Sequence, residues 1–248
     1  AGQSVVNFCS NDYLGLSQHP LLQAAATQAI AAQGTGARAA RLVSGSSPAL
    51  MALEADLAAW KGTEAALVFN SGYQANIGIL QALVGPDDYI FGDRLNHASL
   101  VDGCLLSRAT LKRYRHNKID HLAQLLRLAP AGGQKWIVTD SVFSMDGDVA
   151  PLRDLVTLAE DYDALVMVDE AHATGLYGPS FSGMCEAMGV QHRVALQMGT
   201  FSKALGGFGA YVAGPQVLID TLINRARSWI YSTALPPSVV AANHAAVQ

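Results

Sequence analysis

Polar residues that could do chemistry follow the ends of successive apolar runs in this 248-residue chain. After the run at 65–69 comes a glycine turn, 70–73, whose free N–H groups could bind a phosphate at the start of a helix. His97 and Ser99 follow the next run. The later runs are followed by segment 141–148, by Asp169 with His172, and by Thr200 with Lys203. Together these positions offer anion-binding amides, imidazoles, hydroxyls, a carboxylate and an amine.

Lys203 stands apart from the other lysines because its neighbours, GTFSKALGG, are small or apolar. Such surroundings desolvate an amine and lower its pKa, which keeps part of it neutral. Lys61 is expected to end a helix as a cap, Lys135 to begin a strand, and Lys112 and Lys118 to lie in a basic segment at a solvated edge. Lys203 is therefore the predicted nucleophilic amine.

Each of these groups alone has an ordinary explanation, such as a helix cap or a solitary histidine. The set as a whole fits one cofactor chemistry, that of pyridoxal 5′-phosphate. A lysine holds the aldehyde, a carboxylate pairs with the ring nitrogen so that the ring accepts electrons, and a helix terminus binds the phosphate. An imidazole on the ring face completes such a site.

The elements that must position these residues alternate between short β-branched runs and longer helical patterns. This order predicts an α/β fold, a mostly parallel sheet with helices on both faces, whose functional groups gather at the carboxyl ends of the strands. Ser47-Pro48 predicts a helix start and Gly62 its end. Strands are expected at 65–69, 88–92, 135–140, 164–169, 194–199 and 209–214, and further helices near 73–84, 97–107, 119–128 and 152–162.

Other functions are disfavoured by missing features. Asp169-Glu170-Ala171-His172 resembles a helicase box, but the chain has no phosphate loop of the GxxxxGK[ST] type. The glycines at 34–36 follow a helical stretch, whereas a dinucleotide fingerprint must follow a strand. A net charge of -4 predicts no nucleic-acid partner, and no apolar run is long enough to predict a membrane span. The odd, dispersed cysteines and the absent signal peptide predict a cytoplasmic location without disulfides or a metal site.

The motifs in order resemble those of the α-oxoamine synthases, the acyl-CoA-using branch of the fold type I pyridoxal-phosphate enzymes. The resemblance covers essentially the whole chain. It rests on FCSNDYLGL (8–16), NSGYQAN (70–76), DRLNHASL (93–100), SVFSMDGD (141–148), VDEAHATG (168–175), TFSKALGG (200–207) and YSTALPP (231–237).

The resemblance implies a role for each matching residue. Lys203 would hold the cofactor, Asp169 would pair with the pyridine nitrogen, and His97 would stack on the ring. These three are the implied catalytic residues, and His97 would also face the substrate. The implied cofactor-binding residues are Gly72, Tyr73, His97, Ser144, Asp169, His172, Thr200, Lys203 and Thr233. Asn11 would lie near the carboxylate of the amino-acid substrate, and Thr233 would reach the phosphate of a neighbouring subunit, which implies a homodimer.

The reaction implied most closely condenses L-alanine with a pimeloyl-CoA thioester in biotin biosynthesis, releasing CoA and CO2. Glycine C-acetyltransferase or another α-oxoamine synthase is the alternative within this chemistry. A non-catalytic pyridoxal-phosphate scaffold is the alternative outside it, although a scaffold would not require Lys203, Asp169, His97 and His172 together.

The resemblance also divides the chain. Residues 1–40 are expected to form an N-terminal lead-in, 41–235 a cofactor-binding large domain, and 236–248 the start of a truncated helix leading to an absent small C-terminal domain. Two local departures are Leu50, where relatives usually carry a histidine, and the segment 178–183, which lacks the usual Asn-Gly-Arg character.

Overall fold

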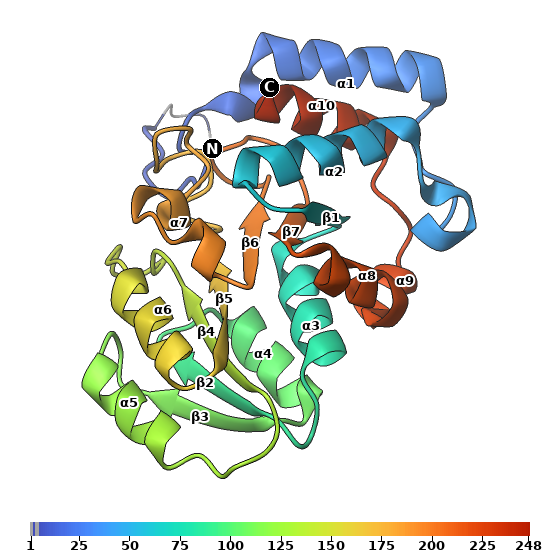
Figure 1. Cartoon of the computed structure of the whole chain (residues 1–248). Coiled ribbons are helices and arrows are strands. Elements are labelled where there is room, and N and C mark those ends of the chain that lie inside the picture. Colours follow the sequence, from blue (N-terminus) through green and yellow to red (C-terminus); the bar gives the residue numbers. More distant parts are fainter. Residues whose placement is uncertain (1, 3–4) are drawn as a thin grey trace.

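A single twisted sheet organises the protein. In a computed structural model, which describes residue 2 and residues 5–248, seven strands form this sheet in the order β1-β7-β6-β5-β4-β2-β3 (Figure 1). The strands are β1 (Ala65–Phe69), β2 (Tyr89–Asp93), β3 (Thr110–Tyr114), β4 (Lys135–Asp140), β5 (Ala164–Asp169), β6 (Leu196–Thr200) and β7 (Ala210–Gly214).

Neighbouring strands from β3 through β2, β4 and β5 to β6 run parallel, and β7 is antiparallel to both β6 and β1. The prediction of a mostly parallel sheet is therefore confirmed. Because the parallel strands end at one edge, residues far apart in sequence meet there. In register, Asp140 at the end of β4 is paired with Asp169 at the end of β5.

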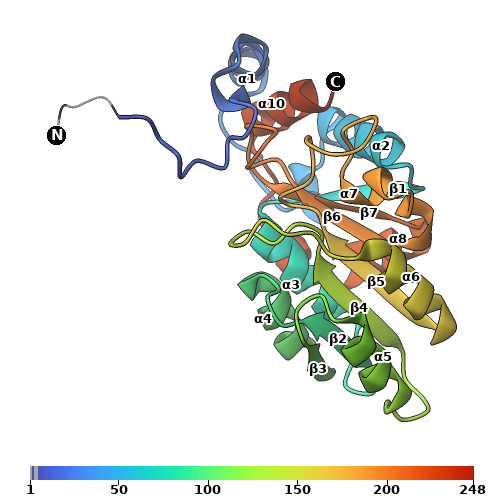
Figure 2. The same cartoon turned by 90° about the vertical axis from the view of Figure 1, so that its left-hand side faces the viewer.

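Helices cover both faces of the sheet, as expected. In β4, Trp136 and Val138 pack into one hydrophobic cluster while Ile137 packs into the cluster on the opposite face. Figure 2 shows α3 and α4 on one side of the sheet and α5 and α6 on the other. The first face carries α3 (Gly72–Leu83), α4 (Ala98–Ser107), α8 (Gln216–Arg225) and α9 (Arg227–Ile230); the second carries α2 (Pro48–Lys61), α5 (Ile119–Arg127), α6 (Leu152–Asp161) and α7 (Met184–Ala187).

The two terminal parts of the chain pack together. Helix α1 (Pro20–Gln33) lies against α10 (Pro237–Val247), which also contacts α2 (Figure 1). Helix α2 begins and ends as predicted: the Ser47 side chain accepts the N–H of Leu50, and Gly62 adopts a left-handed conformation with φ 65°. Three short helical turns complete the fold: η1 (Leu16–Gln18), η2 (Arg41–Gly45) and η3 (Gln191–Arg193).

The main error in the predicted order of elements is β3, which was expected only as a basic solvated segment. It forms the edge strand beside β2, with Lys112 and Arg113 exposed and Tyr114 buried. An edge strand with one buried side chain lacks the apolar run by which the other strands were found. Across the described ranges, none of the helices is both long enough and apolar enough to cross a bilayer.

Candidate active site

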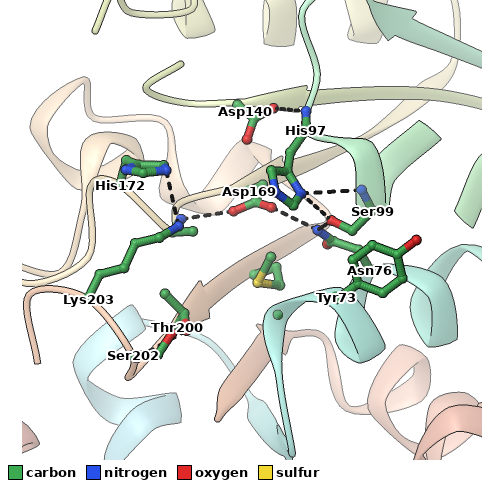
Figure 3. A pocket seen from close by; sticks show the side chains of 13 residues that line it. Tyr73, Asn76, His97, Ser99, Asp140, Asp169, His172, Thr200, Ser202 and Lys203 are labelled. Atoms are coloured by element: carbon green, nitrogen blue, oxygen red, sulfur yellow. Dashed lines mark hydrogen bonds between the residues drawn. The ribbon is translucent and has the colours of Figure 1, made fainter. Parts of the chain in front are cut away.

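A pocket of about 160 Å³ opens at the carboxyl edge of the sheet (Figure 3). Strand ends β4, β5 and β6 and the first turns of α3 and α4 supply its walls. Its lining residues are Gly72, Tyr73, Asn76, His97, Ser99, Asp140, Asp169, Ala171, His172, Met198, Thr200, Ser202 and Lys203. The pocket thus brings together most of the residues singled out in the sequence.

Asp169 provides a buried carboxylate in this pocket, with 3% of its surface exposed. Asn76 Nδ2 donates to its Oδ2 at 2.8 Å, and the N–H of Ala171 donates to its Oδ1 at 2.9 Å (Figure 3). Burial raises the pKa of Asp169, and these hydrogen bonds together with the charges of Lys203 and His97 oppose that rise. The carboxylate has no cation within ion-pair distance among the described residues.

Lys203 and His172 lie side by side, with Lys203 Nζ 3.1 Å from His172 Nε2 (Figure 3). Burial lowers the pKa of Lys203, while the carboxylates of Asp169 and Asp140 act in the opposite direction. Burial also lowers the pKa of His172 to about 4, and the positive charges of Lys203 and His97 add to this effect. The pair therefore consists of a neutral imidazole and an amine that loses its proton more easily than an ordinary lysine.

His97 is held by a hydrogen-bonded chain that reaches Asp169. His97 caps α4: its Nδ1 accepts the N–H of Ser99 at 3.2 Å and lies 2.7 Å from the Ser99 hydroxyl. Asn76 Nδ2 donates to that hydroxyl at 2.9 Å and to Asp169. Because Nδ1 accepts a backbone N–H, the neutral imidazole carries its proton on Nε2.

The start of α3 presents free donors to the same pocket. Ser71 caps the helix through the N–H of Gln74, which leaves the N–H groups of Gly72 and Tyr73 without a hydrogen-bond partner in the described part of the chain. Opposite them, the Thr200 hydroxyl donates to Gly209 O at 2.8 Å. Unpaired amides at a helix N-terminus, with hydroxyls nearby, can bind an anion such as a phosphate.

Asp140 is a second buried acid in the pocket and was not predicted. Its Oδ2 accepts the backbone N–H of His97 at 2.8 Å, which fixes the entry into α4 (Figure 3). Burial and the charge of the neighbouring Asp169 raise the pKa of Asp140. Asn76 was also not predicted, although it lies in a segment noted above, four residues after Gly72. Ser99 was noted together with His97 as a polar residue after the second apolar run, but no role was predicted for it. The helical spacing of Asn76 was the available signal, because a residue one turn after Gly72 faces the same side of α3.

Three residues implied by the resemblance do not line the pocket. Asn11 and Ser144 are exposed, the latter in the turn after β4. Thr233 lies in the segment between α9 and α10, where its carbonyl accepts Asn70 Nδ2 at 2.7 Å. Asn11 is nonetheless linked to the site indirectly, because its Oδ1 lies 3.1 Å from the hydroxyl of Tyr13, which contacts His172.

The expectation that Lys61 caps the end of its helix is wrong. Its ammonium is buried, forms an ion pair with Glu170 and donates to Ser182 O at 2.7 Å. Glu170 in turn accepts the N–H of Cys185 at 2.7 Å. The pair joins the C-terminal end of α2 to the loop that follows β5, the loop that carries His172.

Comparison with known proteins gives consistent results. Residues 3–248 match a family model described as aminotransferase class I and II. An 8-amino-7-oxononanoate synthase of Anaeromyxobacter sp. (strain K) is 58% identical over 247 residues, covering 100% of this chain and 62% of that protein. One of Geobacter sulfurreducens is 58% identical over 246 residues, covering 99% and 63%. The chain thus spans about 62% of the length of these curated relatives.

Solved structures share the fold closely. A serine palmitoyltransferase of Sphingomonas wittichii superposes with a TM-score of 0.94 at 37% identity, covering 96% of this chain and 60% of that one. An 8-amino-7-oxononanoate synthase of Francisella tularensis superposes with a TM-score of 0.83 at 31% identity, covering 97% and 67%. These likenesses confirm the resemblance to the α-oxoamine synthases inferred from the motifs, and the chain belongs to the class I and II aminotransferase family.

Proposed function

We propose that this chain forms the pyridoxal 5′-phosphate site of an enzyme that condenses L-alanine with pimeloyl-CoA to 8-amino-7-oxononanoate, releasing CoA and CO2. The observation that carries the proposal is the buried Asp169 carboxylate beside the pocket that also holds the Lys203 amine. The names of the relatives at 58% identity support the choice of reaction.

The residues present fit this cofactor. Burial raises the pKa of the Asp169 carboxyl, so a cation placed against it would be favourable, and a protonated ring nitrogen is such a cation. The free N–H groups of Gly72 and Tyr73 suit a phosphate. Thr200 lies in the same pocket, and its hydroxyl would donate to the phosphate in place of Gly209 O. A similar solved structure holds this cofactor: a serine palmitoyltransferase of S. paucimobilis with a PLP-myriocin aldimine bound.

Each residue then has a definite task. When bound, pyridoxal phosphate supplies an aldehyde that reacts with amines and a ring that withdraws electrons from the adjacent carbon. Lys203 would bind the aldehyde, and its lowered pKa would let the amine accept and return a proton at the substrate α-carbon. Asp169 would keep the ring nitrogen protonated. His97, oriented through Ser99, would cover the ring and face the substrate.

The remaining implied residues complete the proposal. Ser144 would approach the ring's oxygen together with His172, and Asn11 would lie near the substrate carboxylate. Thr233 lies outside the pocket of its own chain, and its hydroxyl would serve the phosphate of a second copy in a homodimer. Cys104 and Cys185 are buried free thiols, which supports a reducing, cytoplasmic location.

A second reaction of the same chemistry is favoured by one observation. The serine palmitoyltransferase of Sphingomonas wittichii superposes more closely, by TM-score, than the solved 8-amino-7-oxononanoate synthase. Another α-oxoamine synthase activity, with serine or glycine as the amino acid, is therefore the alternative. Sequence identity favours the alanine reaction, because the relatives with that name are 58% identical.

The deciding experiment measures CoA release by the full-length protein with three substrate pairs: alanine with pimeloyl-CoA, serine with palmitoyl-CoA, and glycine with acetyl-CoA. We expect turnover with the first pair and loss of turnover in Lys203→Ala. Release with only another pair would transfer the assignment to that reaction. Borohydride reduction should add the mass of the cofactor to Lys203, and a protein that remains colourless after reconstitution would contradict the enzyme proposal.

A further inference from the structure

Tyr13 reaches the pocket from the N-terminal segment. Its hydroxyl lies 2.7 Å from His172 Nδ1, although the two residues are separated by 159 positions in the sequence. The other nitrogen of the imidazole, Nε2, is 3.1 Å from Lys203 Nζ. The imidazole of His172 is thus held between a phenol on one side and the reactive amine on the other.

The segment that carries Tyr13 is built onto the loop that carries Lys203. Gly206 has φ 65°, and a Cβ there would lie 2.3 Å from Ser17 N, so glycine permits the backbone of the segment to approach. Gly15 turns the segment with φ 67°, and Asp12 Oδ2 accepts the Ser17 hydroxyl at 2.5 Å. The position of the Tyr13 phenol is therefore defined by the same loop that positions Lys203.

The phenol has one proton and two neighbouring acceptors. Its oxygen is 2.7 Å from His172 Nδ1 and 3.1 Å from Asn11 Oδ1. The shorter contact is the better hydrogen bond, so we assign the phenol proton to Nδ1 rather than to Asn11 Oδ1. The exposed amide of Asn11 is then assigned the turned-over orientation, in which its Nδ2 donates to the phenol oxygen. The neutral imidazole then carries its own proton on Nε2, where it faces Lys203.

This tautomer favours the uncharged form of both neighbours. A hydrogen bond donated to Nδ1 stabilises the neutral imidazole, and an N–H at Nε2 can bind the lone pair of a neutral amine but not an ammonium group. The charges of Lys203 and His97 also act on His172, those of Asp169 and Asp140 act on Lys203, and Tyr177 lies near Tyr13. Burial raises the pKa of Tyr13, so the phenol stays protonated and remains a donor.

We propose that Tyr13 is a positioning residue whose hydroxyl fixes the tautomer of His172 and thereby holds Lys203 ready as a neutral nucleophile. The inference rests on the proposed function only where it gives Lys203 the cofactor aldehyde as its target. With this role for Tyr13, the N-terminal segment contributes a functional residue to the active site. No bond is broken, because the phenol, the imidazole and the amine exchange only hydrogen bonds.

The test titrates the cofactor-free protein. Histidine ¹⁵N NMR reports the pKa of His172, and competitive acetylation followed by mass spectrometry reports that of Lys203. In Tyr13→Phe, which keeps the ring, we expect the pKa of His172 to rise by about one pH unit, the size expected for the loss of one hydrogen bond. The pKa of Lys203 should rise too, so its acetylation at neutral pH should slow.

Tyr177→Phe is the matched control, since Tyr177 is similarly exposed and its hydroxyl has no hydrogen-bond partner in the residues that the structure describes. It should leave both pKa values unchanged. A second variant distinguishes loss of the hydrogen bond from detachment of the N-terminal segment. Site-specific 3-fluorotyrosine at position 13 keeps the packing and is a stronger acid, hence a stronger donor, so it should lower the pKa of His172.

Unchanged pKa values in Tyr13→Phe, an equal rise in Tyr177→Phe, or a rise with 3-fluorotyrosine would each overturn the proposal. These titrations require neither cofactor nor substrate. A failure of the proposed condensation therefore leaves them interpretable, and a failure of the Tyr13 role leaves the reaction assignment intact.

Discussion

Lys61 and Glu170 form an ion pair from which solvent is excluded on both sides: each side chain has 0% of its surface exposed. Glu170 directly follows Asp169, so the pair lies immediately behind the carboxylate of the active site. Gly183 packs so closely against Glu170 that a Cβ there would lie 2.5 Å from the carboxylate. The chain from β5 to α7 is therefore attached to α2 through buried charges.

Lys61→Met should destabilise the protein by about 3–5 kcal/mol, because it leaves the buried Glu170 charge unpaired. Urea unfolding of the isolated chain measures this loss. Adding Glu170→Gln to Lys61→Met should restore part of the stability by removing that charge. Lys112→Met, an exposed lysine on β3, should change the free energy of unfolding by less than about 0.5 kcal/mol. If Lys61→Met and Lys112→Met lowered the free energy of unfolding equally, the Lys61–Glu170 ion pair would not be important for stability.

Asp169→Asn should weaken pyridoxal-phosphate binding by roughly 10- to 100-fold, the range expected when one hydrogen bond to a charged group is lost. The amide is similar in size but cannot carry the negative charge that a protonated ring nitrogen requires. Titration of the protein with cofactor, followed by its visible absorption, measures the dissociation constant. Asp154→Asn, on the exposed face of α6, serves as the control and should bind normally; unaltered binding in Asp169→Asn would remove that residue from the cofactor site.

Asn76→Ala should weaken cofactor binding by roughly tenfold, the effect of one lost hydrogen bond. Without Asn76 the pKa of Asp169 rises further, because its hydrogen bond lowers that pKa in the intact protein. The Ser99 hydroxyl that orients His97 loses a donor as well. The same cofactor titration measures the change. Asn224→Ala, which removes an exposed amide on α8, should have no effect, and an equally small effect at Asn76 would disprove the network.

His116 should make a contribution to stability that depends on pH. Its ring nitrogens lie 2.9 Å from Asp93 and 2.6 Å from Asp148. Burial lowers the pKa of His116, but hydrogen bonds and the charges of the two carboxylates raise it by more, so the net pKa is above its usual value. The contribution of His116 to stability is therefore complete at pH values below its pKa in the unfolded chain. It is lost as the pH rises through its pKa in the folded protein.

His116→Gln should accordingly lower the free energy of unfolding by about 1.5–3 kcal/mol at pH 6 and by less at pH 9. Urea unfolding at both pH values tests this. His192→Gln, an exposed histidine without a hydrogen bond in the described residues, should show no such difference. A loss that is the same at both pH values would show that His116 acts by packing alone.

Much of the site could be predicted because the reactive residues follow recognisable strands. The expected strands at 65–69, 135–140 and 164–169 coincide with β1, β4 and β5, most of whose apolar residues are buried, on both faces of the sheet. Parallel strands bring their carboxyl ends to one edge, so the polar residues after them had to meet. Asp169, His172 and Lys203 were found for this reason.

Other features depend on contacts that no local pattern reveals. Lys61 does end α2, but its burial was not predicted because the loop that buries it comes more than a hundred residues later. Asp140 is the last residue of a predicted strand. Its carboxylate belongs to the site because β4 pairs with β5, which places Asp140 beside Asp169, and the sequence does not reveal this pairing. Strand β3 is polar because it lies at the edge of the sheet and buries a single large side chain, Tyr114.

The reversal of direction at β7 has a mechanical consequence for Lys203. Thr200 and Ala210 are paired across β6 and β7, and Phe201 N–H donates to Gly209 O at 3.0 Å, so both ends of the lysine loop are fastened to one sheet. Gly207 N–H closes the loop again on Phe201 O at 2.8 Å. The backbone that carries Lys203 is thus held in place by hydrogen bonds. Any travel of the amine between cofactor and substrate must come from rotation about its own side-chain bonds, which occurs far faster than movement of a loop.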